Sequence, residues 1–179
     1  MKEEVKSIFN QAWQHRNDGN YKSSRELLNQ VLALDSSDPN VVAQVYAYQG
    51  QIERDLESPK KALLLYSKAL KEYQSSGNKN GIAYAERHIA DIAMELNIHE
   101  QAEESFKRAL TIYREEESGN AMNIANTVRG YALLQEKTHQ YHKSRPLWEE
   151  AREIYNRFNI QEGVGECDHH LSNLDKLMD

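Results

Sequence analysis

The sequence predicts an all-α protein built from repeated pairs of helices. Three observations support this fold class. The 179 residues include only 8 Gly and 3 Pro, about half the usual share, which is too few to form the turns of a many-stranded sandwich or barrel. Apolar and small residues recur at offsets of 0, 4, 7 and 11, which follow one face of a helix. The same segments also return along the chain, at similar intervals from one copy to the next.

One of the two repeated segments has a small residue, a large aromatic residue, Ala and Tyr at these offsets. It starts at positions 62, 102 and 144, and its aromatic residues are Tyr66, Phe106 and Trp148. A weaker copy starts at Ser24, with Leu28 in the aromatic position. Each copy is therefore predicted to be an amphipathic helix that buries its aromatic side.

The other repeated segment precedes the first kind and ends on a small residue. It covers residues 42–50, 82–90 and 124–132, and its last residues are Gly50, Ala90 and Ala132. A short side chain at that point lets two helix backbones approach closely. The step from this segment to its partner is constant, from 42 to 62, from 82 to 102 and from 124 to 144, so length varies only in the connection between one pair and the next.

Prolines mark several predicted helix starts. Pro39 follows Asp38 and Pro59 follows Ser58, so each proline stands directly after a good N-cap residue. Pro146 does not fit, because it falls in the early part of a predicted helix. We expect that helix to start late, near Ser144, or to bend there.

The C-terminal segment matches the first-helix pattern once more. Its partner would begin near position 184, beyond the last residue of the sequence. It is therefore predicted to cap the stack as a ninth helix. The side chains expected to be buried are those of Val164, Cys167, Leu171, Leu174 and Met178. A longer array, of which this chain is a piece, is the alternative.

These paired segments resemble tetratricopeptide repeats, in the long variant of about 40–42 residues found in kinesin light chains and bacterial peptide-sensing regulators. The resemblance implies a right-handed α-solenoid of four helix pairs with a C-terminal capping helix, forming one domain over residues 1–179. The expected repeats cover about 4–38, 39–78, 80–119 and 121–160, and the capping helix covers 162–178. Ser144 and Pro146 depart from the family pattern in the fourth repeat.

The resemblance also implies that the first helices line an inner binding surface. By their offsets, the residues expected there are Phe9, Asn10, Trp13, Gln44, Tyr48, Gln51, Arg54, Tyr84, Arg87, His88, Asp91, Asn126, Arg129, Leu133, Glu166, His169 and His170. This set contains three arginines and three histidines against two carboxylates, although the whole chain has a net charge of −6. We therefore expect it to bind an extended or helical segment of another protein that carries acidic residues.

Nine of these residues are our candidates for partner binding: Trp13, Tyr48, Arg54, Tyr84, Arg87, His88, Asn126, Arg129 and His170. The alternative is that Arg87 and Arg129 only form ion pairs with Asp91, Glu95 or neighbouring helices. The Lys, Asn and Arg clamp of chaperone-binding relatives is absent, because the corresponding positions hold Phe9, Trp13, Tyr48, Tyr84 and His88.

No catalytic function, cofactor or metal is expected. The sequence lacks a phosphate-binding glycine loop, a nucleophile elbow and a zinc-protease motif. Cys167 and His170 are metal-ligand residue types at a spacing of three, but Cys167 falls on the predicted buried face, and His139 and His142 fall at a turn and a helix start. The best prediction is a scaffold without catalysis.

Composition narrows the partners and the location. The sequence has no block of Lys and Arg for nucleic acid and no apolar run long enough for a membrane span. The single cysteine fits a reducing compartment, so a cytoplasmic location is expected. Two alternatives stay open: a peptide-sensing regulator that changes shape or assembly on binding, and a weak homodimer through the C-terminal helix.

Overall fold

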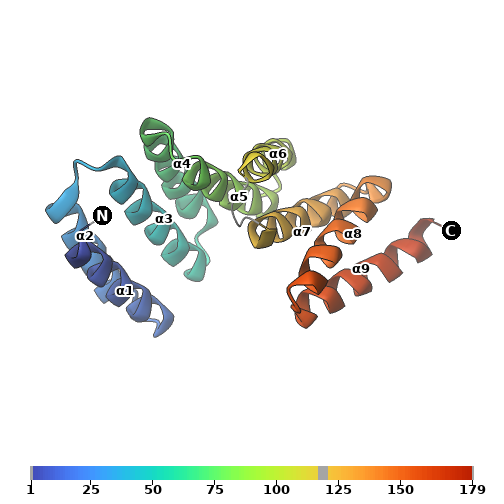
Figure 1. The fold of residues 1–179 in the computed structure, drawn as a ribbon, viewed down its shortest axis with the longest axis horizontal. Helices are drawn as coiled ribbons and strands as arrows, with labels where there is room; N and C mark the ends of the chain where they lie inside the picture. The colour runs from blue at the N-terminus through green and yellow to red at the C-terminus, as the bar shows by residue number, and fades with distance from the viewer. Residues whose placement is uncertain (1, 117–120, 179) are drawn as a thin grey trace. The chain divides into compact units, whose positions relative to one another are not determined.

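The computed structural model describes residues 2–116 and 121–178, and within these ranges it contains nine α-helices and no strand (Figure 1). The predicted all-α fold class is therefore confirmed. The helices are α1 (Glu3–Asn17), α2 (Tyr21–Asp35), α3 (Pro39–Asp55), α4 (Pro59–Ser76), α5 (Lys79–Glu95), α6 (His99–Glu115), α7 (Ala121–Lys137), α8 (Tyr141–Arg157) and α9 (Gln161–Met178).

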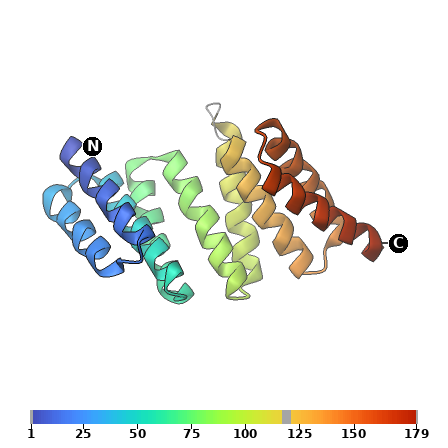
Figure 2. The same cartoon turned by 90° about the horizontal axis from the view of Figure 1, so that it is seen from below.

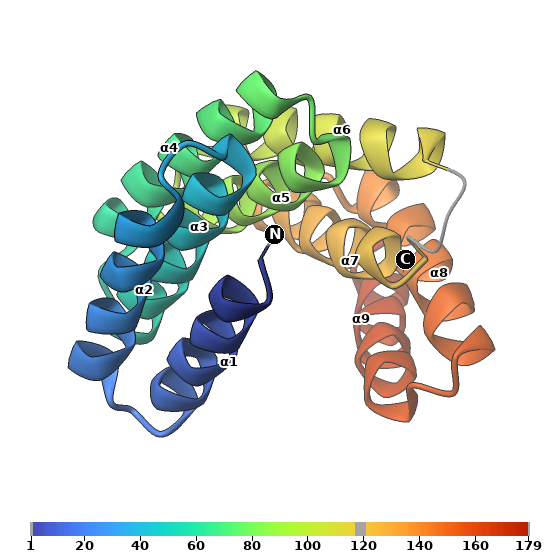
Figure 3. The same ribbon diagram turned by 60° about the vertical axis from the view of Figure 1, so that its left-hand side comes forward.

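The chain forms two compact units, the first ending at Ile92 and the second beginning at Ala93. Consecutive helices within each unit run antiparallel to each other (Figure 2). In the first unit α1 packs on α2 and α3 packs on α4, while in the second unit α7 packs on α8 and α8 packs on α9. Figure 3 shows α2 and α4 on one side of the first unit. The α3–α4 and α7–α8 contacts join the pairs that the constant spacing predicts, and the α8–α9 contact is that of the predicted capping helix.

The turn inside each helix pair has the same backbone geometry in all four pairs. One residue of each turn has a left-handed conformation, with φ of 74° at Gly19, 51° at Glu57, 61° at Asn97 and 58° at His139. The amide after it donates to the carbonyl five residues earlier, as from Ser58 to Glu53 at 2.8 Å. Because this is a closed helix-ending motif with a fixed number of residues, the spacing within a pair is constant.

Helix starts agree with the proline positions, with one exception. Both α3 and α4 begin at a proline, and the Asp38 side chain accepts a hydrogen bond of 2.8 Å from the Asn40 amide. The late start expected for α8 is wrong, because this helix begins at Tyr141 and contains Pro146. Because a proline has no backbone N–H, one carbonyl in the preceding turn of the helix lacks its usual donor. Pro146 is exposed, so water can hydrogen-bond to that carbonyl instead.

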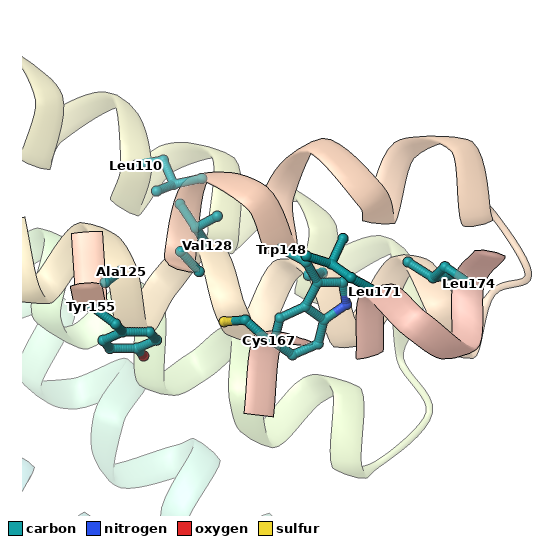
Figure 4. Close-up of a cluster of buried hydrophobic side chains, with 10 residues drawn as sticks. Leu110, Ala125, Val128, Trp148, Tyr155, Cys167, Leu171 and Leu174 are labelled. Carbon is teal, nitrogen blue, oxygen red and sulfur yellow. The ribbon is translucent and has the colours of Figure 1, made fainter. Parts of the chain in front are cut away.

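Each unit has its own hydrophobic core. In the first unit, Phe9 is buried among core residues, so its predicted place on the binding surface is wrong. In the second unit, Trp148 and Tyr155 of α8 pack with residues of α7 and α9 (Figure 4). The capping helix buries Cys167, Leu171 and Leu174 as predicted and covers Val164 only partly, while the Met178 side chain lies outside the described part of the chain.

The serines in the small-residue position have a specific contact. Ser24 is fully buried and donates from Oγ to the Ala12 carbonyl at 2.8 Å, and Ser144 donates in the same way to the Ala132 carbonyl at 3.1 Å. The hydroxyl therefore satisfies its hydrogen-bonding requirement while the side chain stays small. Ser144 is thus compatible with the close helix contact that Ala makes in other pairs.

Aromatic rings pack directly on glycines where helices approach closely. A Cβ atom at Gly163 would lie 2.7 Å from two atoms of the Tyr155 ring, whereas a Cβ atom at Gly165 would meet nothing within 4 Å. Both glycines belong to α9. Substitutions at these two glycines therefore distinguish the effect of helix propensity on stability from the effect of packing.

We expect Gly163→Ala to lower the free energy of unfolding and Gly165→Ala to raise it. The first change forces the Tyr155 ring away at a cost of about 1–3 kcal/mol. The second change adds only helix propensity, worth up to about 1 kcal/mol. Chemical denaturation of both variants measures the difference, and equal effects at the two positions would contradict the packing assigned to Gly163.

Candidate partner-binding face

Polar contacts connect α1, α3 and α5 in the first unit. Arg16 of α1 donates through Nε and Nη2 to the Asp55 carboxylate of α3, at 2.7 and 2.9 Å. Gln51 of α3 donates through Nε2 to the Tyr84 hydroxyl of α5 at 2.5 Å. We call the surface formed by these three helices the α1–α3–α5 face. It contains six of the nine candidate residues.

Arg16 was missed by the sequence analysis, although the repeat contains a signal for it. Arg16 stands at the same offset from Glu4 as Arg54 does from Val42, so the two arginines occupy equivalent positions. The hydrogen bonds to Asp55 raise the pKa of Arg16. Arg16 therefore stays positively charged, and the Asp55 carboxylate balances this charge.

One hollow on this face is an arginine pocket of about 350 Å³. Its lining residues come from α1, α3, α4 and α5 and are Arg16, Gln51, Arg54, Asp55, Tyr66 and His88. Arg54 is exposed and forms no ion pair with any described residue, although its charge acts on both Tyr66 and His88. The pocket therefore contains one arginine whose charge has no carboxylate partner.

His88 forms part of the wall of this pocket and is nearly buried, with 8% of its surface exposed. Its ring stacks on Tyr66 with a centroid distance of 4.7 Å, and Arg87 donates from Nη2 to its Nε2 at 2.7 Å. Because a guanidinium can only donate, Nε2 accepts and the proton of the neutral ring is on Nδ1. That Nδ1 is buried and has no hydrogen-bond partner among the described residues.

Burial lowers the pKa of His88 well below its ordinary value, and the charges of Arg87, Arg54 and Arg16 add to this effect. Burial also raises the pKa of the Tyr66 phenol, with a further contribution from Tyr84. Both groups are therefore neutral hydrogen-bond donors at neutral pH.

Another hollow on the face is a tyrosine pocket of about 330 Å³. It is lined by Gln44, Ala47, Tyr48, Tyr73, Asn78, Asn80, Gly81 and Tyr84. The Tyr48 ring also packs against Phe9 at a centroid distance of 5.3 Å, so the side chain is held in place. This pocket is neutral and offers tyrosine rings and side-chain amides.

The remaining candidates of the first unit differ in how freely a partner could contact them. Trp13 is 50% exposed and contributes a large apolar surface. Arg87 lies 3.4 Å from the Asp91 carboxylate, besides its contact with His88. The pairing of Arg87 with Asp91 is the alternative that the sequence left open.

The three candidates of the second unit all have partners within that unit. Asn126 accepts a hydrogen bond from the Tyr155 hydroxyl at 2.8 Å, and Arg129 forms an ion pair with Glu166 at 2.7 Å. His170 contacts the Glu136 carboxylate through Nδ1 at 3.0 Å and stacks on Trp148. These three side chains therefore contribute to the internal contacts of the second unit.

Comparison with known proteins identifies the repeat. Residues 81–157 match the family model described as tetratricopeptide repeat. These residues therefore contain tetratricopeptide repeats. No curated protein matches it in sequence.

Solved structures share the fold of this chain. BtubC (BKLC) from P. vanneervenii has a TM-score of 0.72 and 17% identity, over 97% of this chain and 80% of that one. The apo form of RapI has a TM-score of 0.82 and 15% identity, over 92% of this chain and 60% of that one. Aspartyl phosphate phosphatase F from Bacillus subtilis has a TM-score of 0.77 and 13% identity, over 96% of this chain and 45% of that one. The likeness concerns the fold.

The residue types that suggested metal chemistry do not come together. Within residues 2–116 and 121–178, no group of three or more His, Cys, Asp or Glu side chains is arranged to hold a metal ion. Cys167 is buried, and burial together with Glu166 and Asp168 raises its pKa to about 11. No helix in those same ranges combines the length and hydropathy of a membrane span.

We expect His88 to make the stability of the protein depend on pH. Because its pKa in the folded state is well below the ordinary value of 6.5, the unfolded chain binds a proton here that the folded chain does not. The stabilisation is complete above about pH 6.5 and is lost as the pH falls toward the folded-state pKa. Its slope is at most about 1.4 kcal/mol per pH unit.

Urea unfolding between about pH 7.5 and about pH 5.5 measures this slope. His88→Gln should flatten the pH dependence, and His142→Gln, which changes an exposed histidine of α8, should leave it unchanged. The same slope in the His88→Gln variant and in the original chain would show that another group is responsible.

A second prediction concerns the thiol. With a pKa of about 11, Cys167 has very little thiolate at neutral pH, so iodoacetamide should alkylate it much more slowly in the folded chain than in urea. Mass spectrometry of the labelled chain measures both rates. Equal rates in the two conditions would contradict the burial of Cys167.

Proposed function

We propose that this tetratricopeptide repeat protein is an interaction scaffold that binds an acidic segment of another protein on the α1–α3–α5 face. The observation that carries the proposal is Arg54, an exposed arginine in a pocket, without an ion-pair partner among the described residues. An unpaired guanidinium beside buried neutral donors favours a ligand with negative charge.

The local charge balance supports an acidic ligand. The chain has a net charge of −6, yet three arginines, Arg16, Arg54 and Arg87, lie on this face, and in the described part of the chain their ion pairs are with Asp55 and Asp91. Arg16 pairs with Asp55 and Arg87 lies beside Asp91, which leaves the charge of Arg54. A positively charged patch on an acidic protein also steers an acidic segment toward it.

Aromatic side chains on the same face support binding of a polypeptide. Trp13 is half exposed, while Tyr48 and Tyr84 line the tyrosine pocket. Such rings add contact area with little loss of side-chain entropy, and they are common among residues that dominate interface energies. The binding segment would therefore contact a charged pocket and a neutral aromatic pocket along one face.

The proposed role excludes catalysis and includes a cytoplasmic location. Its support is that the sequence lacks a phosphate-binding glycine loop, a nucleophile elbow and a zinc-protease motif, together with a buried cysteine that has no disulfide partner in the sequence. The binding segment comes from a protein, and neither nucleic acid nor a membrane is a proposed partner.

A peptide-sensing regulator is the second proposed function. Its support is the fold shared with RapI and with a protein named aspartyl phosphate phosphatase, although the chain spans 60% and 45% of their lengths. Such a regulator changes shape or assembly when its ligand binds, whereas a scaffold does not. Small-angle scattering with and without a bound peptide separates the two functions.

Self-association through α9 has limited support in the surface of that helix. Leu174 is already buried, and Leu177 is 59% exposed. The exposed apolar surface of α9 is therefore small for a stable dimer, which buries about 800 Å² on each partner. Sedimentation of the chain and of Leu177→Asp measures any contribution of this residue.

We expect selection from a random peptide library on the immobilised chain to enrich Asp and Glu. Arg54→Gln should reduce that enrichment, because it removes the unpaired charge and keeps a side chain of similar length. Lys71→Gln removes one positive charge at an exposed residue of α4 and is the control for net charge. Enrichment of neutral or basic peptides, or equal enrichment by Arg54→Gln, would contradict an acidic partner on this face.

A further inference from the structure

The two units contain equivalent stacked pairs of an aromatic ring and a histidine. In the first unit Tyr66 stacks on His88, with centroids 4.7 Å apart and planes at 15°. In the second unit Trp148 stacks on His170, with centroids 4.1 Å apart and planes at 13°. Tyr66 and Trp148 stand at the same offset from the start of their repeats, at positions 42 and 124, so the pairs also match in sequence.

In the second unit, a carboxylate satisfies the donors of this pair. Glu136 accepts a hydrogen bond from Trp148 Nε1 and lies 3.0 Å from Nδ1 of His170. Glu136 is half-buried and belongs to α7, the first helix of the same pair as Trp148. The stacked rings and the carboxylate thus form one closed polar cluster.

The equivalent position in the first unit holds an arginine. Glu136 stands at the same offset from position 124 as Arg54 does from position 42. Because a guanidinium has no acceptor, Arg54 cannot satisfy the neighbouring donors. Nδ1 of His88 and the hydroxyl of Tyr66 are both buried, and neither has a hydrogen-bond partner among the described residues.

We infer that the arginine pocket binds a side-chain carboxylate of the partner segment, which occupies the place that Glu136 has in the second unit. This inference rests on the proposed function and names the group that the α1–α3–α5 face recognises. The bound carboxylate accepts hydrogen bonds from His88 Nδ1 and the Tyr66 hydroxyl, and it pairs with the guanidinium of Arg54.

The charges around the pocket favour a single negative charge. The lining contains Arg16, Arg54 and Asp55, and Arg16 and Asp55 neutralise each other through two hydrogen bonds. One positive charge remains, that of Arg54, which one carboxylate balances. The nearby Asp55 carboxylate repels a doubly charged phosphate group, so a carboxylate is the better match.

Nuclear magnetic resonance of histidine side chains tests the contact directly. The chain is labelled with ¹⁵N at histidine, and His88→Gln assigns the Nδ1 signal. The probe is an acetylated and amidated peptide of alternating Glu and Ala, and its matched control has Gln in place of Glu. We expect the Glu peptide to shift the His88 signal and to bind at least about tenfold more tightly than the Gln peptide.

A third peptide separates the two sources of a carboxylate. It contains alternating Gln and Ala but ends in a free carboxyl group. A His88 shift with this peptide equal to that with the Glu peptide would overturn the assignment to a side chain. No shift with it, together with a shift by the Glu peptide, supports the assignment.

Arg54→Glu provides a test that needs no ligand. It gives the first unit the internal carboxylate that the second unit has, so we expect the His88 Nδ1 signal to move and the melting temperature to rise by about 2 °C or more. Binding of the Glu peptide should weaken at least about tenfold. Lys71→Glu makes the same change of charge on α4 and should change neither property.

The outcomes distinguish this inference from the proposed function. If Arg54→Glu binds the Glu peptide as tightly as the original chain, both the carboxylate site and the acidic partner on this face are wrong. If the Glu peptide binds without shifting the His88 signal, the carboxylate site is wrong, whereas an enrichment of acidic peptides that Arg54→Gln reduces would still support the proposed function. If the library enriches no acidic peptides at all, the proposed acidic partner is wrong. Arg54→Gln, which adds no charge, keeps the binding test valid if Arg54→Glu unfolds.

Discussion

One aromatic ring fills the space between two neighbouring first helices, and the first unit depends on this packing. A Cβ atom on Gly50 of α3 would lie 2.8 Å from the Tyr66 ring of α4, and the same ring stacks on His88 of α5. The small residue allows the ring to enter, and the ring then sets the distance between α3 and α5. Protein interiors tolerate little change in volume at such a contact.

The same ring brings the polar chemistry together. Tyr66 stacks on His88 and lines the pocket together with Arg54, and Trp148 donates a hydrogen bond from its indole nitrogen to Glu136. The two units therefore share the stacked pair of rings. The residue at the equivalent position, Arg54 in the first unit and Glu136 in the second, decides whether the donors of that pair are satisfied within the unit. A carboxylate there closes the cluster from within, and an arginine leaves donors that only an external acceptor can satisfy.

The sequence predicted the helices and their pairing because both depend on short-range patterns. The helical period identifies each amphipathic segment, and the closed turns with a left-handed residue keep the spacing within each pair constant. Pro146 was misread for a physical reason. A proline on an exposed side can stay inside a helix, because water replaces the missing donor.

The site was only partly predictable. Offsets placed Tyr48, Arg54 and Tyr84 on one face, and the same comparison applied to the first repeat would have added Arg16. Offsets could not separate the paired Arg129 from the unpaired Arg54, because pairing depends on side chains of another helix that is distant in sequence, as Glu166 is from Arg129. Phe9 was misplaced because it lies at the edge of the predicted binding side of its helix. A side chain at that edge can also point into the core.

The arginine pocket draws its walls from α1, α3, α4 and α5, and this has a thermodynamic consequence for the first unit. The pocket exists only while these four helices are folded together, so a ligand that fills it binds the native state and not the unfolded chain. Its free concentration then adds RT ln(1 + [L]/Kd) to the free energy of unfolding of that unit. Where unfolded chains are degraded, the abundance of the partner would control the lifetime of the scaffold.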